Sequence, residues 1–339
     1  MSGVLGWDIG GANLKVARVV DGAVVAALEE PFALWRDPGR LPEALARLAA
    51  RAGGGSPTMA VTLTAELADC FATKREGVAF VLDALRIAFP GCEIRVYGVD
   101  GRFRDPDAAR RAPLRVAAAN WAAAAAFVAR RHPDALLIDV GSTTTDIIPI
   151  VAGRIAARGR TDPGRLMNGE LVYTGVLRSP VMSIVRRVPL RGGWCRVAAE
   201  HFAIAADVHC WLRHIPPDAY RCETPDGRGV GRREAAARIA RTVCADLEML
   251  SPRDVTRIAR HVARAQRARI VAAIRQVLGR LGAAAPRLAL AAGAGAFLAR
   301  DAARAAGLDV VDLAGTLEPA AARALPAAAV AWLLAEERR

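Results

Sequence analysis

The chain carries one short motif twice, and this duplication constrains its fold more than any other feature. An apolar run ends in Asp-x-Gly at Trp7-Asp8-Ile9-Gly10-Gly11 and again at Ile138-Asp139-Val140-Gly141-Ser142. In both copies apolar residues resume after the turn, which predicts a strand, a tight hairpin and a returning strand. Two similar domains that face one another would place these hairpins on opposite sides of a central cleft.

Strand and helix patterns alternate along the rest of the chain, which predicts an α/β protein. The length suits two domains, and we expect a first domain over residues 1–131 and a second over residues 132–313. A last helix within residues 314–339, beginning near Pro319, is expected to pack back on the first domain. An alanine-rich helix is predicted from Pro113 to Arg130, because proline suits the first helical position.

The composition excludes a disordered chain and a membrane-spanning one. Hydrophobic residues make up 53% of the 339 residues and charged residues 24%, as in globular proteins with a sizeable core. The longest uncharged apolar run, Val116 to Ala129, is shorter than the ~20 residues that a spanning helix needs. No signal-peptide pattern is visible, so we expect a cytoplasmic protein with no membrane partner.

The net charge of +13 raises nucleic-acid binding as an alternative function. Arginines gather in the predicted helix Pro252–Leu281, but an apolar stripe runs through the same segment. A solvated arginine face over a buried stripe explains this pattern, and no recognition motif accompanies it. The sequence therefore argues against nucleic acid as the partner.

The two Asp-x-Gly hairpins have the chemistry of a phosphate site. Glycine lets the backbone approach a ligand closely, and consecutive N–H groups of a turn bind anions. An aspartate at the end of a strand holds hydrated Mg²⁺ together with phosphate oxygens. A third turn, Ala291–Gly295, follows a predicted strand and opens a helix whose N-terminus suits the same ligand. We expect phosphate contacts from these three turns, at Gly10, Gly11, Asn13, Gly141, Ser142, Thr143, Thr144, Gly293 and Gly295.

Four blocks together resemble a known family: Gly6–Lys15, Thr62–Phe71, Leu137–Ile147 and Gly169–Arg178. They are similar to the hydantoinase/oxoprolinase-like branch of the actin-like ATPase superfamily, which also contains sugar kinases and heat-shock chaperones. Within that branch they resemble the tetrahydromethanopterin-linked one-carbon transfer pathway proteins. The resemblance covers nearly the whole chain and implies a duplicated actin-like, ribonuclease H-like fold with two domains and a central cleft.

The resemblance also implies an activity. Archaeal members of the family are methanofuran-biosynthesis enzymes that join an aminomethylfuran-methyl diphosphate to the phenol of γ-glutamyltyramine and release diphosphate. It therefore implies a transferase with a small anionic substrate, a phenolic acceptor and Mg²⁺. The first hairpin has Ala12-Asn13-Leu14 where many kinases carry hydroxyl residues, which puts handling of the ATP γ-phosphate in doubt.

The residues can be matched to this chemistry. A departing diphosphate needs magnesium and cations, and a phenol needs a base. We expect Asp8 and Asp139 to organise the metal and Lys15 to supply a catalytic charge; Glu66 is the first candidate for the base, with Asp69 and Glu170 left open. Substrate contacts are expected from the remaining polar candidates: Asp69, Lys74, Arg75, Asn120, Glu170, Tyr173 and Arg178.

An ATP-dependent kinase or a hydantoinase/oxoprolinase-type hydrolase is the main alternative, because it shares the fold and the phosphate hairpins. Nucleotide binding separates the two interpretations: the alternative needs ATP, whereas the transferase does not. The sequence leaves open whether ATP binds and whether the chain forms a homo-oligomer.

Overall fold

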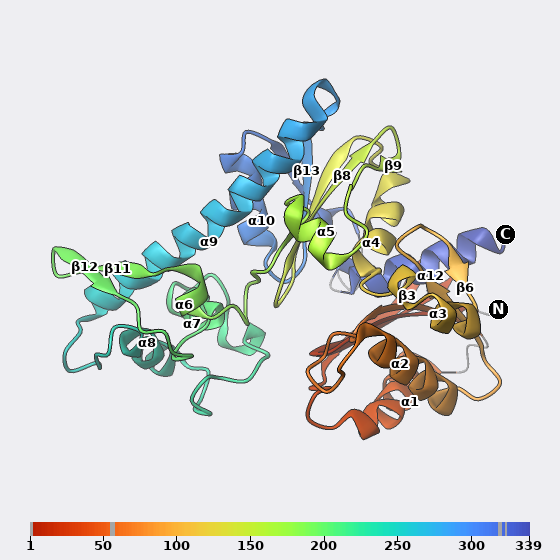
Figure 1. The fold of residues 1–339 in the computed structure, drawn as a ribbon, viewed down its shortest axis with the longest axis horizontal. Coiled ribbons are helices and arrows are strands. Elements are labelled where there is room, and N and C mark those ends of the chain that lie inside the picture. The colour runs from red at the N-terminus through yellow and green to blue at the C-terminus, as the bar shows by residue number, and fades with distance from the viewer. Residues whose placement is uncertain (1–2, 55–57, 318–320, 323) are drawn as a thin grey trace.

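The computed structural model describes residues 3–54, 58–317, 321–322 and 324–339. Its first sheet has six strands in the order β3–β2–β1–β4–β5–β6 (Figure 1). The strand β1 pairs with β2 in an antiparallel hairpin and with β4 in parallel. The strands of this sheet are β1 Val4–Gly10, β2 Asn13–Val20, β3 Ala23–Pro31, β4 Thr58–Thr64, β5 Glu93–Tyr97 and β6 Phe103–Arg104.

The second sheet repeats the pattern, in the order β10–β8–β7–β13–β14. Its strand β7 pairs with β8 in an antiparallel hairpin and with β13 in parallel. The short β9 adds to β8. The strands are β7 Ala135–Val140, β8 Thr145–Val151, β9 Arg154–Ile155, β10 Leu171–Val172, β13 Leu288–Ala292 and β14 Asp309–Asp312.

Successive side chains along a strand point to opposite faces of the sheet, so each face packs against its own set of helices. On β1, Leu5, Trp7 and Ile9 pack in one core with α1 and α2, whereas Val4 on the opposite face belongs to a core shared with α4 and α12. That second core also contains Leu137 of the second sheet, so α4 and α12 lie between the two sheets. The helices on these faces are α1 Leu41–Arg51, α2 Lys74–Ala88, α3 Pro106–Arg111, α4 Asn120–Ala129 and α12 Leu325–Glu337.

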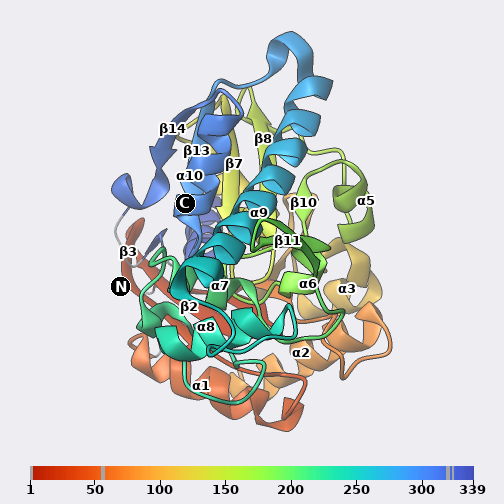
Figure 2. The same ribbon diagram turned by 90° about the vertical axis from the view of Figure 1, so that its left-hand side faces the viewer.

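The other face of the second sheet is covered by α10 and by the C-terminal half of the long helix α9. The N-terminal half of α9 carries an outer lobe, defined as residues 181–250, which Figure 1 shows extending away from the second sheet and which faces the viewer in Figure 2. Part of this lobe, including Ile204 and Tyr220, packs in the core of the second sheet. Buried Ile258 and Val262 of α9 pack against this lobe, so the apolar stripe of the arginine-rich segment is core. The elements are α5 Asp162–Met167, α6 Val181–Ile184, β11 Arg187–Leu190, β12 Gly193–Arg196, α7 Ala205–Trp211, α8 Arg232–Arg241, α9 Pro252–Leu281 and α10 Ala296–Ala305.

The helix predicted from Pro113 to Arg130 is shorter in the structure. Pro113–Arg115 form a single 3₁₀ turn, and α4 begins only at Asn120. Ala118 has a φ of 49°, in the left-handed region, which interrupts a right-handed helix. Asn120 therefore lies in the first turn of α4, not in the middle of a helix.

The predicted α/β class with two strand–hairpin units is confirmed by the two sheets. The division at residues 131 and 132 stays a prediction, and the start proposed for the last helix near Pro319 lies outside the described residues. Within the ranges that the structure describes, no helix combines the length and the apolar character that crossing a bilayer requires.

Candidate active site

The first hairpin brings a carboxylate and an ammonium together. Asp8 on β1 faces Lys15 on β2 in the antiparallel register, and Lys15 Nζ lies 3.6 Å from Asp8 Oδ2. The hydroxyl of Thr64 on β4 donates to Asp8 Oδ1 at 3.4 Å. Only 4% of Asp8 is exposed. Burial raises the pKa of Asp8, and the charge of Lys15 offsets part of the rise.

The second hairpin contributes Asp139, which lies within electrostatic reach of the first. Burial and then the neighbouring Asp146 raise the pKa of Asp139 from 3.8 to about 6, while Lys15 opposes the rise and Asp8 adds to it. Burial disfavours the charge of Lys15, but Asp8, Glu29 and Asp139 together raise its pKa. The structure thus brings Asp8, Lys15 and Asp139 into one cluster with more negative than positive charge.

The segment around Gly175 braces the second hairpin. The N–H of Arg178 donates to Ser142 O at 2.9 Å, and the N–H of Val176 donates to Gly141 O at 3.0 Å. A Cβ on Gly175 would lie 2.5 Å from the Thr143 nitrogen, so only glycine fits there. The block that resembles the family at Gly169–Arg178 is therefore packed directly against the second hairpin.

The third turn also lies against the second hairpin. Gly293 has a φ of 84°, and a Cβ there would collide with the Asp139 carboxylate. The N–H of Gly295 donates to Val140 O at 2.8 Å, and α10 begins at the next residue. The three predicted turns are therefore two facing hairpins with the glycine turn packed behind Asp139.

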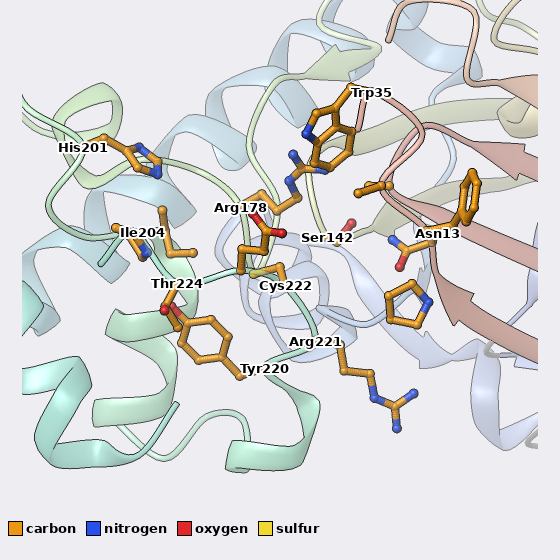
Figure 3. Close-up of a pocket in the computed structure, with 16 residues that line it drawn as sticks. Asn13, Trp35, Ser142, Arg178, His201, Ile204, Tyr220, Arg221, Cys222 and Thr224 are labelled. Carbon is orange, nitrogen blue, oxygen red and sulfur yellow. The ribbon is translucent and has the colours of Figure 1, made fainter. Parts of the chain in front are cut away.

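A pocket of about 800 Å³ opens beside the hairpins and takes side chains from both sheets' loops and from the outer lobe (Figure 3). Of the predicted site residues, only Asn13, Ser142 and Arg178 line it. The Arg178 guanidinium lies 4.8 Å from the centre of the Trp35 ring. Several lining residues were not predicted from the sequence: Trp35, His201, Tyr220, Arg221, Cys222 and Glu223.

The charges of the pocket favour an anion. Glu223 is paired with Arg36 at 2.6 Å across the rim, so its charge is already balanced. Arg178 and Arg221 have no carboxylate partner among the described side chains. Arg178 and Arg221 are thus available to bind a negatively charged ligand.

Glu66 and Lys74 lie on the opposite flank. In the strand order β3–β2–β1–β4, two strands separate the segment after β4, which holds Glu66, from the segment after β3, which lines the pocket. Glu66 Oε1 lies 3.4 Å from Lys74 Nζ, and Lys74 also donates to Asp162 of α5. Burial raises the pKa of Glu66 from 4.5 to about 7, and Lys74 works against this rise. Asp162 is a member of this cluster that the sequence analysis missed.

The remaining predicted residues are scattered. Asp69, Arg75 and Tyr173 are exposed and line neither the pocket nor the Asp8 cluster. Asn120 is half-buried, and its side chain accepts a hydrogen bond from the N–H of Trp121.

The structure corrects the role predicted for Glu170. Its carboxylate accepts hydrogen bonds from the N–H groups of Arg158 and Gly159 and pairs with Arg280. Both of its oxygens are therefore engaged by the protein, and Glu170 is fully buried. We assign it a structural role in place of the substrate-binding role that the sequence predicted.

A further residue that the sequence did not reveal is Gln266 of α9. Its amide nitrogen donates to Thr174 Oγ1 at 2.9 Å and to Gly175 O at 2.8 Å, and its oxygen meets the ring nitrogen Nε2 of His209 at 2.8 Å. Gln266 is buried. A buried amide that satisfies these groups supports the segment beneath the second hairpin.

Glu66→Gln is expected to change how stability depends on pH. The folded protein binds the Glu66 proton more tightly than the unfolded chain, because its pKa is raised from 4.5 to about 7. Stability is therefore lost as the pH rises through that window. The neutral glutamine removes this loss, so the Tm of the variant should fall less than that of the parent between pH 5 and pH 8. Thermal melts of both proteins at several pH values measure this difference in Tm, with exposed Glu43→Gln as the control. An equal dependence of Tm on pH in the parent and in Glu66→Gln would contradict the prediction.

Comparisons with known proteins agree on family and fold. The model of the hydantoinase/oxoprolinase family matches residues 57–337. A (4-{4-[2-(gamma-L-glutamylamino)ethyl]phenoxymethyl}furan-2-yl)methanamine synthase of Methanocaldococcus jannaschii is 40% identical over 248 residues, which cover 73% of this chain and 73% of that protein. A protein of the same name from Methanococcus vannielii is 42% identical over 124 residues, 37% of this chain and 55% of its own length.

Solved structures share the architecture at low identity. A ROK family glucokinase from Streptomyces griseus, in complex with glucose and AMPPNP, matches with a TM-score of 0.50 and 15% identity, covering 99% of this chain and 100% of the kinase. A nucleotide-free acetone carboxylase matches with a TM-score of 0.52 and 13% identity, covering 89% of this chain and 45% of the carboxylase. These matches confirm the predicted duplicated actin-like fold.

Proposed function

This chain belongs to the hydantoinase/oxoprolinase family, and from that premise we propose that it is a transferase of methanofuran-type cofactor biosynthesis. It joins an aminomethylfuran-methyl diphosphate to the phenol of a glutamyltyramine-like acceptor and releases diphosphate. The observation that carries the proposal is the 40% identity, over 73% of both chains, to a synthase whose name describes a phenoxymethyl-furan. That name contains the ether bond that the reaction forms.

The Asp8–Lys15–Asp139 cluster is the proposed diphosphate site. Buried Asp8 pairs with Lys15 there, and half-buried Asp139 acts on the same lysine, so two carboxylates face one ammonium and negative charge is left uncompensated. Such a pair fits Mg²⁺, which prefers oxygen ligands and is commonly held by one or two carboxylates together with substrate phosphates. When bound, the ion supplies positive charge that stabilises the departing diphosphate. Lys15 and the N–H groups of the hairpins add to that stabilisation.

The two substrates are proposed to meet from opposite flanks. The pocket with Asn13, Ser142 and Arg178 is positively charged and suits the diphosphate substrate. Its volume of about 800 Å³ lies in the range of small-molecule sites. The flank with Glu66 holds a carboxyl group with a raised pKa and suits the phenol, whose proton must be removed. The methylene carbon would then lie between the leaving phosphate and the incoming oxygen.

The decisive experiment incubates the purified protein and Mg²⁺ with the furan-methyl diphosphate and γ-glutamyltyramine. We expect release of diphosphate in equal amount to a coupled product of the combined mass, and no requirement for ATP. An ATP-dependent kinase or hydrolase is the second candidate, because the fold is shared with an AMPPNP-bound glucokinase. Phosphorylated acceptor or ATP hydrolysis without coupled product would favour that candidate and contradict the transferase.

Arg178→Ala is expected to raise the KM for the furan diphosphate about 10–100-fold, the worth of a charged hydrogen bond. Its backbone N–H would still brace Ser142, because alanine keeps that group. Steady-state kinetics with varied diphosphate measure the effect. Arg228→Ala is the control, since Arg228 is exposed on the outer lobe and does not line this pocket. An unchanged KM at Arg178→Ala would place the diphosphate elsewhere.

A further inference from the structure

Glu66 has one carboxylate oxygen in use and one free. Its Oε1 lies 3.4 Å from Lys74 Nζ. Its Oε2 is buried and has no hydrogen-bond partner within the described part of the chain. The residue as a whole is 1% exposed. A buried carboxylate oxygen without a donor is costly, and such an atom commonly marks a position that a ligand group fills.

Lys74 is shared between two acids that come from different parts of the fold. It is the first residue of α2, which packs on the first sheet, and its ammonium reaches Asp162 of α5, in the segment that leads to β10 of the second sheet. The Lys74 ammonium lies closer to the Asp162 carboxylate than to the Glu66 carboxylate, which is 3.4 Å away. Lys74 therefore joins the two halves of the molecule, and its charge is shared between Asp162 and Glu66.

This sharing sets the charge that Glu66 experiences. Among the described residues, Lys74 on α2 and Asp162 on α5 are the charged side chains with the largest effect on its pKa, and a hydrogen bond from the backbone N–H of Glu66 itself also lowers that pKa. Burial raises the pKa of Glu66 to about 7, Lys74 lowers it, and Asp162 raises it again. If the Lys74 ammonium paired with Glu66 alone, it would favour the ionised form of Glu66 and make Glu66 a weaker base. Asp162 limits that effect because it pairs with the same ammonium.

We propose that the free Oε2 of Glu66 is the site where the acceptor's phenolic hydroxyl docks and that Asp162 is a positioning residue, which draws Lys74 away from Glu66. This inference rests on the proposed function. The phenol O–H bond breaks and its proton passes to Oε2. The phenol oxygen then forms a bond to the furan methylene carbon. The bond from that carbon to the phosphate oxygen breaks, and its electron pair leaves with the diphosphate.

The test is the pH dependence of kcat/KM for the acceptor, measured by the coupled product. For the parent protein we expect an acid limb with a midpoint near pH 7, the raised pKa of Glu66. Asp162→Asn removes the competing charge, so Lys74 acts on Glu66 alone and the midpoint should move down by about one pH unit. Glu66→Gln should abolish the limb and reduce the rate at neutral pH by about 10²–10⁴-fold. A more acidic, nitro-substituted phenol should recover much of that loss.

Asp312→Asn is the matched control. It also removes a carboxylate from an ion pair, with Arg300, and contacts neither Lys74 nor Glu66, so its midpoint should equal that of the parent. An unmoved midpoint in Asp162→Asn would overturn the positioning role. A limb that survives in Glu66→Gln, or no recovery with the acidic phenol, would overturn the docking site. Absence of coupled product from the parent protein would instead overturn the proposed function.

Discussion

Replacing either Asp8 or Asp139 by asparagine is expected to lower kcat about 10²–10³-fold, the usual effect of removing one major electrostatic contact. Asparagine keeps the shape of the side chain but removes the charge that holds a cation against the diphosphate. The loss should appear in kcat more than in KM, because the interaction strengthens as charge develops on the leaving group. Both variants should fold, since the surrounding protein raises the pKa of both carboxyl groups and so already disfavours their charge.

A binding measurement separates this effect from a damaged fold. Calorimetric titration with inorganic diphosphate, with and without Mg²⁺, should show Mg²⁺-dependent binding in the parent and its loss in both variants. Asp21→Asn is the control, because Asp21 is exposed in the turn after β2 and has no part in the cluster. Tenfold or smaller effects on kcat at both positions, with diphosphate binding intact, would refute the assignment of these carboxylates.

Arg238→Met is expected to destabilise the protein by about 3–5 kcal/mol, as breaking one side of a buried ion pair does. Arg238 Nε lies 2.7 Å from Asp207 Oδ1, and both side chains are 0% exposed. Asp207 also accepts hydrogen bonds from the hydroxyl of Tyr220 at 2.9 Å and from the N–H of Ile204 at 3.0 Å. Methionine fills the space but leaves the buried carboxylate without its counter-charge. Because Tyr220 and Ile204 line the pocket, the wall of the proposed diphosphate site should loosen as well.

Urea unfolding measures the change in the free energy of unfolding. Arg241→Met is the matched control: Arg241 lies on α8 like Arg238 and is 2.9 Å from Asp226, but its side chain is about a third exposed. An exposed pair is worth at most about 1 kcal/mol, so the control should change little. The double replacement Asp207→Asn with Arg238→Met should recover part of the loss, because no charge is then left buried alone. Equal effects of Arg238→Met and Arg241→Met would contradict the buried-pair argument.

The local motifs were sufficient to predict the two hairpins and the glycine turn. Each strand-turn-strand unit is contiguous in sequence, and its turn chemistry is set by neighbouring residues. Register along the hairpin then places Asp8 opposite Lys15. The α/β class, the two-fold repetition and the family could be predicted for the same reason, since all three follow from short contiguous patterns. The helix predicted from Pro113 to Arg130 is interrupted by the backbone of Ala118, which no composition signal marks.

What the sequence by itself determined was therefore the pair of Asp-x-Gly hairpins that carry Asp8 and Asp139, for which phosphate binding is our proposal. Only the tertiary structure decided which side chains complete it. Lys74 and Asp162 are 88 residues apart, Gln266 and Thr174 are 92 apart, and Arg36 and Glu223 are 187 apart. It likewise decided that Glu170 is engaged by backbone N–H groups and Arg280, while Glu66 keeps a free oxygen. The physical reason is that the charge and proton affinity of a buried carboxyl depend on which groups packing brings beside it, and sequence distance carries no record of that.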